Sequence, residues 1–196
     1  MSLFRRIYPM LFAVALVALA GCATSSSLLE QSAPPDQPPL ELRQLTGTWY
    51  VIAHVPYFTE RGQVAARDEY TLLPDGRVAV RYVYRTGFHA PARAVEAIAT
   101  VEPGSGNRDW RMHVFRVVRT TQHILELAPD NSWVLVTTPD RDLAWIFARR
   151  PAMEGKTYQR LLRKLRGYGI NSDKVWRMAQ TPEQVGGLGF ERPNND

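Results

Sequence analysis

The chain has 196 residues, a formal net charge of +5 and a single cysteine, so an internal disulfide is excluded. Burial alone must stabilise the fold, and about 140 ordered residues suffice for one independent core and leave no room for a second domain. The basic residues are scattered, or gathered around Arg160 to Arg166, rather than arranged in long Lys/Arg blocks. A nucleic-acid partner is therefore not expected.

The N-terminus has the pattern of a cleaved export signal. Arg5 and Arg6 precede an apolar run from Met10 to Ala20, which at about eleven residues is too short to span a bilayer as a helix. With the signal removed, 22 basic residues face 19 acidic ones, a formal net charge of +3.

The residues Leu19, Ala20, Gly21 and Cys22 resemble the bacterial lipobox. The resemblance implies that Cys22 is diacylglycerylated, that the bond before it is cut, and that the new amino terminus is acylated. Because Ala23 rather than aspartate follows, the related sorting rule favours the outer membrane, with the protein facing the periplasm or the cell surface. The alternatives are a chance cysteine or a plain secretory cleavage site within Ala18 to Ala20.

Residues 22–44 are predicted to be the lipid anchor and a disordered tether. The segment is rich in serine, glutamine and proline, and Pro34, Pro35, Pro38 and Pro39 favour extended backbone without internal hydrogen bonds.

From Leu45 onward, short runs rich in valine, isoleucine, tyrosine and tryptophan alternate with turn residues every eight to twelve positions or so. The clearest turn is Pro74 to Gly76, where the glycine accepts a positive φ. Consecutive hairpins predict an all-β, eight-stranded up-and-down antiparallel barrel, because closure removes the two edges and eight strands can hold one small ligand. The predicted strands are Thr48–Val55, Ala66–Leu73, Arg77–Tyr84, Arg93–Val101, Trp110–Arg119, His123–Leu127, Trp133–Thr138 and Trp145–Arg149.

The hydrophobic period changes once, near the C-terminus. Leu161, Leu162 and Leu165 recur at helical spacing between Gly155 and Gly167, which predicts one amphipathic helix. A short ninth strand is predicted at Asp173 to Met178, and residues 181–196 are predicted to be a flexible tail.

Two separated motifs resemble the lipocalin signature, closest to bacterial lipocalins of the outer-membrane lipoprotein type. Gly47 to Tyr50 open the first strand, and Pro139 to Arg149 end the barrel segment. Glu60 to Gly62 and Asp130 to Trp133 extend the likeness, which runs over residues 45–180. The resemblance implies a lipocalin calyx with a C-terminal helix.

In that family the tryptophan of the first motif lies beneath an arginine of the last barrel strand. The matching residues are Trp49 and Arg149, and such a cation–π pair is worth roughly 1–2 kcal/mol. Gly47 is expected to allow a tight turn into the closed end. Neither Trp49 nor Arg149 is expected to touch a ligand, and Arg150 is the weaker candidate for the stack because it points to the other face.

The ligand-binding candidates are inward side chains, chosen strand by strand as the less polar alternating set. An inward Arg116 would pair with a carboxylate or a phosphate, while a bulge that turns it outward is the alternative. The candidates are Tyr82, Tyr84, Trp110, Met112, Val114, Arg116, Leu125, Trp133 and Leu135.

A largely apolar lining favours a ligand with an alkyl chain. The family resemblance implies binding of a fatty acid or a lysophospholipid, for storage or transport at the cell envelope. No cofactor is expected, and Asp140 and Asp142 are interpreted as a charged turn rather than a metal site.

Two other classes of function stay open. One is a lipid-anchored structural or interaction protein, with the basic helix on anionic head groups, or with Tyr57 and Phe58 contacting a membrane or a second subunit of a homodimer. The other is an enzyme acting on a bound lipid. The sequence has neither a nucleophile elbow nor histidines at metal-ligand spacing, so the prediction is a protein that is not an enzyme.

Overall fold

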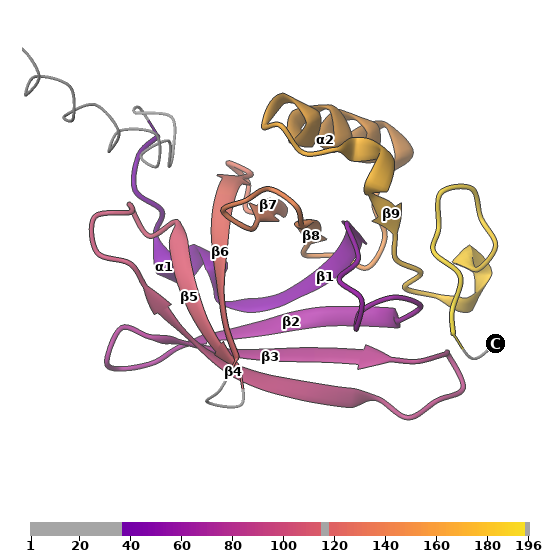
Figure 1. Cartoon of the computed structure of the whole chain (residues 1–196), viewed down its shortest axis with the longest axis horizontal. Helices are drawn as coiled ribbons and strands as arrows, with labels where there is room; N and C mark the ends of the chain where they lie inside the picture. Colours follow the sequence, from indigo (N-terminus) through magenta and orange to yellow (C-terminus); the bar gives the residue numbers. More distant parts are fainter. Residues whose placement is uncertain (1–36, 115–117, 195–196) are drawn as a thin grey trace, which may run out of the picture. The chain divides into compact units, whose positions relative to one another are not determined.

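The computed structural model describes residues 37–114 and 118–194 of the chain, and its core is one antiparallel sheet. The strands follow one another in the order β2-β3-β4-β5-β6-β7-β8-β1, and β1 also pairs with β2, so the sheet closes into a barrel (Figure 1). This confirms the predicted eight-stranded barrel with one extra strand and a C-terminal helix. The strands are β1 Gly47–His54, β2 Val64–Leu72, β3 Val78–Arg85, β4 Arg93–Val101, β5 Asp109–Val114, β6 Val118–Leu127, β7 Trp133–Thr137, β8 Ala144–Ala148 and β9 Trp176–Arg177.

One predicted strand is wrong in its extent. The segment from Trp110 to Arg119 does not form a single strand, because β5 ends at Val114 and β6 begins at Val118. Asp109 pairs with His123 and Val114 with Val118, so the chain reverses between those two valines. This part of the sequence has no glycine, proline or asparagine that would predict a turn. The position of the turn follows instead from how β5 and β6 pair.

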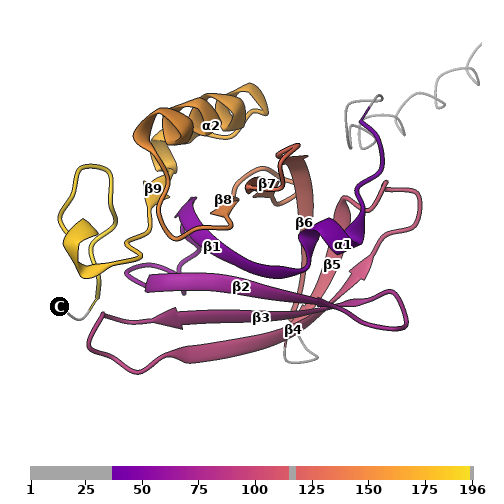
Figure 2. The same ribbon diagram turned by 180° about the vertical axis from the view of Figure 1, so that it is seen from behind.

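The domain begins before the predicted boundary at Leu45. The helix α1 (Leu42–Leu45) lies beside the start of β1 (Figure 2), and Leu40 is buried in the barrel core. The Leu40 amide donates to the carbonyl of Gly106 at 2.9 Å, and Arg108 donates to the carbonyl of Pro38 at 3.2 Å. The predicted disordered tether is therefore wrong for residues 37–44, while residues 22–36 lie outside the described part of the chain.

The helix α2 (Gly155–Gly167) lies over β7 and β8 on the outside of the barrel (Figure 1). Tyr158, Leu161 and Leu165 form its buried face, as the periodicity predicts, and pack in a second apolar cluster outside the barrel. The short helix η1 (Ser172–Lys174) then leads to β9, which is shorter than the predicted ninth strand.

The last described residues are not the flexible tail that the sequence predicts. They form the short helix η2 (Pro182–Gln184), and Phe190 makes an isolated bridge to Arg177. The segment returns to the end of the barrel opposite α1 (Figure 2). Glycine-rich composition suggests disorder, but carbonyl and amide groups of this segment bond to the barrel.

Within the described residues, no helix combines the length and the apolar character needed to cross a membrane.

Candidate functional site

The interior of the barrel is sealed at one end and reached by solvent toward the other. At the end where β1 begins, Trp49 and Ala99 are 0% exposed, and Val78 is 2% exposed. Tyr84 on β3 and Val114 on β5 lie toward the opposite end, point to the same interior cluster, and stay partly exposed. Leu72 and Val101, which end β2 and β4 near the base, are partly exposed as well, but their partners Val78 and Trp110 are buried, whereas Tyr82 and Tyr84 are both partly exposed.

The sealed end is held together by Trp49 and Arg149. The Arg149 Cζ lies 3.6 Å from the centroid of the Trp49 ring, the contact that the sequence analysis expects. Arg149 also donates to the carbonyls of Thr48 at 3.0 Å and Gln44 at 2.6 Å, and the Trp49 indole donates to the carbonyl of Leu45 at 2.8 Å. The bonds to Gln44 and Leu45 satisfy carbonyls at the end of α1, and the bond to Thr48 ties Arg149 to the start of β1.

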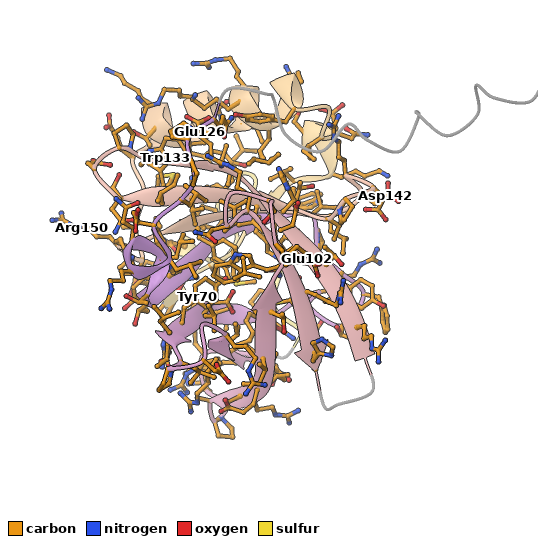
Figure 3. All side chains as sticks on the ribbon, turned by 90° about the vertical axis from the view of Figure 1, so that its left-hand side faces the viewer. Tyr70, Glu102, Glu126, Trp133, Asp142 and Arg150 are labelled. Carbon is orange, nitrogen blue, oxygen red and sulfur yellow. The ribbon has the colours of Figure 1, made fainter. Side chains whose placement is uncertain are left out.

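Gly47 is required at this end for two reasons. Its φ of +94° lies where side chains are strained, and an added Cβ would lie 3.3 Å from Arg149 Nη1. Arg150, by contrast, is exposed and points away from the barrel (Figure 3), as expected for the neighbour of an inward residue.

Five of the predicted lining residues lie on the interior face, in or against the cluster inside the barrel. Aromatic contacts involve three of them. The ring centroids of Tyr82 and Tyr84 are 5.3 Å apart in a stacked arrangement, and those of Trp110 and Tyr70 are 5.5 Å apart. Their role in ligand binding stays a prediction. The five are Tyr82, Tyr84, Trp110, Met112 and Val114.

Three other predicted lining residues, Leu125, Trp133 and Leu135, are misplaced by the sequence analysis. They pack in the outer cluster with α2, and Figure 3 shows Trp133 on the side that faces the helix. On β6 a register shift between Ile124 and Glu126 changes the alternation.

On β7 every residue is buried, because the barrel interior covers one face and α2 the other. On β7, hydrophobicity therefore does not distinguish the residues that face the barrel interior from those that face α2. The apolar residues of β6 and β7 that belong to the interior cluster are Ile124, Leu127, Val134 and Val136.

Two further predictions, Arg116 as a head-group ligand and Cys22 as the lipid attachment point, lie outside the described residues.

The barrel also contains a buried polar cluster that was not predicted from the sequence. His54 is 1% exposed and pairs across β1 and β8 with Trp145, an interior residue. Its Nδ1 lies 3.2 Å from Glu60 Oε2, and its Nε2 lies 3.1 Å from Glu191 Oε2. The Trp145 indole donates to the same Glu60 oxygen at 3.4 Å.

Both ring nitrogens of His54 face carboxylate oxygens, an arrangement that favours the protonated ring because it can donate from both nitrogens. Burial lowers the pKa of His54, but the hydrogen bonds and negative charges of Glu191 and Glu60 outweigh this effect and raise the pKa above 6.5. The sequence contains a weak signal for this site, because Glu60 opens a motif of the family resemblance.

Asp68 is the second buried ionisable group of the interior. It lies between Trp49 and Tyr82 in the strand register, and its Oδ2 accepts from the Tyr70 hydroxyl at 2.8 Å. Burial raises the pKa of Asp68 to about 7, the hydrogen bond from Tyr70 opposes the shift, and the charge of Glu60 adds to it. The carboxyl is therefore largely protonated below neutral pH.

Tyr82, the strand-register partner of Asp68, is hydrogen-bonded to the loop after β1. Its hydroxyl donates to Gln63 Oε1 at 2.5 Å, and the Gln63 amide donates to the carbonyl of Thr59 at 2.8 Å. Burial, followed by the charges of Glu60 and Asp68, raises the pKa of Tyr82 well above its usual value. The phenol therefore acts as a neutral donor in the interior.

The pair Asp140 and Asp142 forms a turn. Asp140 Oδ1 accepts from the Asp142 amide at 3.2 Å and from the Thr138 hydroxyl. Within the described residues, no group of three histidine, cysteine or acidic side chains is arranged to hold a metal ion.

Comparisons with known proteins match most of the chain. A family model described as a lipocalin-like domain matches residues 40–180. Temperature-induced lipocalin-1 of Arabidopsis thaliana is 27% identical over 151 residues, which cover 72% of this chain and 80% of that protein. Outer membrane lipoprotein Blc of Escherichia coli (strain K12) is 26% identical over 185 residues, which cover 82% of this chain and 96% of that protein.

A solved structure extends the comparison to the fold. Insecticyanin from the tobacco hornworm Manduca sexta superposes with a TM-score of 0.59 at 18% identity, over 82% of this chain and 90% of that one. At that identity the likeness concerns the fold alone, and it agrees with the closed barrel described above.

Proposed function

This chain belongs to the lipocalin-like domain family, and from that premise we propose that its barrel binds a small hydrophobic ligand, a single-chain lipid such as a fatty acid or a lysophospholipid. The observation that carries the proposal is the gradient of exposure along the interior. Inward apolar side chains are sealed at the Trp49 end and partly exposed at Tyr84 and Val114. An alkyl chain placed along these side chains gains about 0.8 kcal/mol for each CH₂ group that it buries.

We further propose that the protein is anchored in the outer membrane through a lipid on Cys22 and stores or carries its ligand at the cell envelope. Support comes from the lipobox-like residues before Cys22 and from the relatives that are named outer membrane lipoproteins. The segment between Cys22 and the barrel is short, so the ligand site would stay close to the membrane that supplies the lipid.

We propose binding as the role because the family match is to a lipocalin-like domain. Within residues 37–114 and 118–194, no serine, threonine or cysteine side chain is hydrogen-bonded to a histidine. His54 is held instead by the carboxylates of Glu60 and Glu191, which leaves it no hydroxyl or thiol to activate.

The test is a fluorescence titration of the delipidated protein with laurate and with a lysophospholipid, together with mass spectrometry of what organic solvent extracts from it. Saturable tryptophan quenching is expected. Tyr84→Ala removes an inward aromatic ring and should weaken binding several-fold, whereas Tyr50→Ala removes a half-buried ring on the outer face and should leave it unchanged.

Two results would refute the carrier role. Absence of saturable binding and of any extracted lipid would favour the structural alternative. Conversion of the added lipid into a product would indicate an enzyme.

A further inference from the structure

The chain continues beyond the family match, and this continuation returns to the open end of the barrel. The family model ends at residue 180, and the tail, residues 181–194, follows it. The Arg177 amide donates to the carbonyl of Gly189 at 2.8 Å, and the Glu191 amide donates to the carbonyl of Arg177 at 2.9 Å. These two bonds hold the tail beside β9 and the end of β1 (Figure 1).

The end of the tail is also bonded to the loop that follows β1. Asn194 donates from its backbone to the carbonyl of Gly62 at 3.1 Å, and from its side chain to the carbonyl of Arg61 at 2.6 Å. A Cβ at Gly62 would lie 2.2 Å from Asn194 Oδ1, so the tail fills the space that the glycine leaves.

Between these contacts the tail directs one carboxylate into the barrel. Glu191 Oε2 lies 3.1 Å from His54 Nε2, and its side chain is only 15% exposed. His54 faces the interior, and the charge of Glu191 also contributes to raising the pKa of the inward Tyr82. The tail therefore places a negative charge among the side chains of the proposed ligand site.

An anion at this position would be bound by the His54 ring itself, whose two nitrogens already hold two carboxylates. Glu60 from the loop after β1 occupies the Nδ1 side, and Glu191 occupies the Nε2 side. The Trp145 indole from β8 donates to the same Glu60 carboxylate, so it holds Glu60 beside the ring. Of these two carboxylates, only Glu191 belongs to a segment that lies outside the family match.

The tail is held by few apolar contacts. Leu188 is fully exposed, and the apolar anchor is Phe190, whose ring centroid lies 4.3 Å from the Arg177 Cζ. Most tail residues are exposed, so releasing the tail exposes little apolar surface and leaves the strand pairs of the barrel intact.

We propose that His54 is a binding residue for the anionic head group of the barrel's ligand, and that Glu191 is a built-in competitor that occupies this position until a ligand displaces the tail. The proposal rests on the proposed function, because it requires a lipid in the same interior. When a lipid carboxylate replaces the Glu191 carboxylate at His54 Nε2, the net charge of the cluster is unchanged, and the alkyl chain extends past Tyr82 and Tyr84.

The experiment compares three ligands of equal chain length, laurate, dodecanol and dodecylamine, on the full chain and on Glu191→Ala. A charge-assisted hydrogen bond to the competitor is lost in the variant, so laurate should bind at least about tenfold more tightly. Dodecanol should gain much less, and dodecylamine should not gain more than dodecanol. The matched control is Glu183→Ala, which removes an exposed carboxylate of the same tail and should change none of the three affinities.

Two more measurements separate the head-group role from simple blockage of the opening. Adding His54→Gln to Glu191→Ala should cancel most of the gain for laurate. In the unmodified protein, laurate should lower the hydrogen-exchange protection of the Glu191 and Asn194 amides, because the displaced tail loses its bonds to Arg177 and Gly62.

Three other outcomes would refute the competition, the head-group role or the carrier function. Equal gains for laurate and dodecanol would mean that the tail blocks entry without competing for His54. Unchanged laurate affinity in Glu191→Ala would refute the competition while leaving lipid binding in place. If none of the three ligands binds either protein, the carrier function itself fails.

Discussion

Asp68→Asn is expected to stabilise the protein, and to do so more strongly as the pH rises. The carboxyl of Asp68 is buried, and its pKa is raised from 3.8 to about 7. Asparagine has nearly the same shape, stays neutral at every pH, and offers its amide oxygen to the Tyr70 hydroxyl that now donates to Asp68. The variant therefore resembles the protonated form of the native residue.

The magnitude follows from the difference between the folded and unfolded pKa values. Below pH 3.8 the carboxyl is protonated in both states and does not affect the free energy of unfolding. Between pH 3.8 and about 7 the unfolded chain loses the proton and the folded protein keeps it, so stability falls by about 1.4 kcal/mol per pH unit. Above pH 7 the loss is complete, at about 4 kcal/mol.

The assay is urea unfolding of both proteins at pH 5, 6, 7 and 8. The advantage of Asp68→Asn should grow by about 3 kcal/mol from pH 5 to pH 8. Asp75→Asn is the control, because Asp75 is exposed and hydrogen bonds from Arg77 lower its pKa, so its removal should not stabilise the protein at high pH. An advantage of Asp68→Asn that is constant over this range would show that the carboxyl titrates normally and that the burial argument is wrong.

The remaining predictions concern the base of the barrel, its outer face and the anchor. Arg149→Ala should lower the free energy of unfolding by about 2 kcal/mol, because it removes the stack on Trp49 and the hydrogen bond to α1. The control Arg150→Ala should lower it by less than about 0.5 kcal/mol. Equal losses for the two variants in urea unfolding would contradict the pairing of Trp49 with Arg149. Leu135→Ala should cost about 2–5 kcal/mol yet leave the laurate Kd of the folded protein unchanged, because Leu135 packs against α2. A tenfold weaker Kd would place that side chain in the ligand site instead. Cys22→Ala should move the protein from the membrane fraction to the soluble fraction and abolish labelling by radioactive fatty acid; persistent membrane attachment would count against the anchor.

Much of the barrel could be predicted because its signals are local. Turn residues such as Gly76, and the alternation on β3, mark the strands without reference to the rest of the chain. The base could be predicted as well, because the motifs around Trp49 and Arg149 resemble a known family. The reversal between β5 and β6 could not be predicted, since pairing with neighbouring strands rather than a turn residue sets it.

The sequence by itself determined how many strands form and that they pair in antiparallel succession, because periodicity and turn chemistry act over a few residues. Only the tertiary structure decided whether a buried side chain packs inside the barrel or against α2. Leu135 and Val136 are equally apolar neighbours, yet one packs against α2 and the other lines the barrel. The contact between Glu191 and His54 forms between residues far apart in the chain, so no local sequence pattern predicts it.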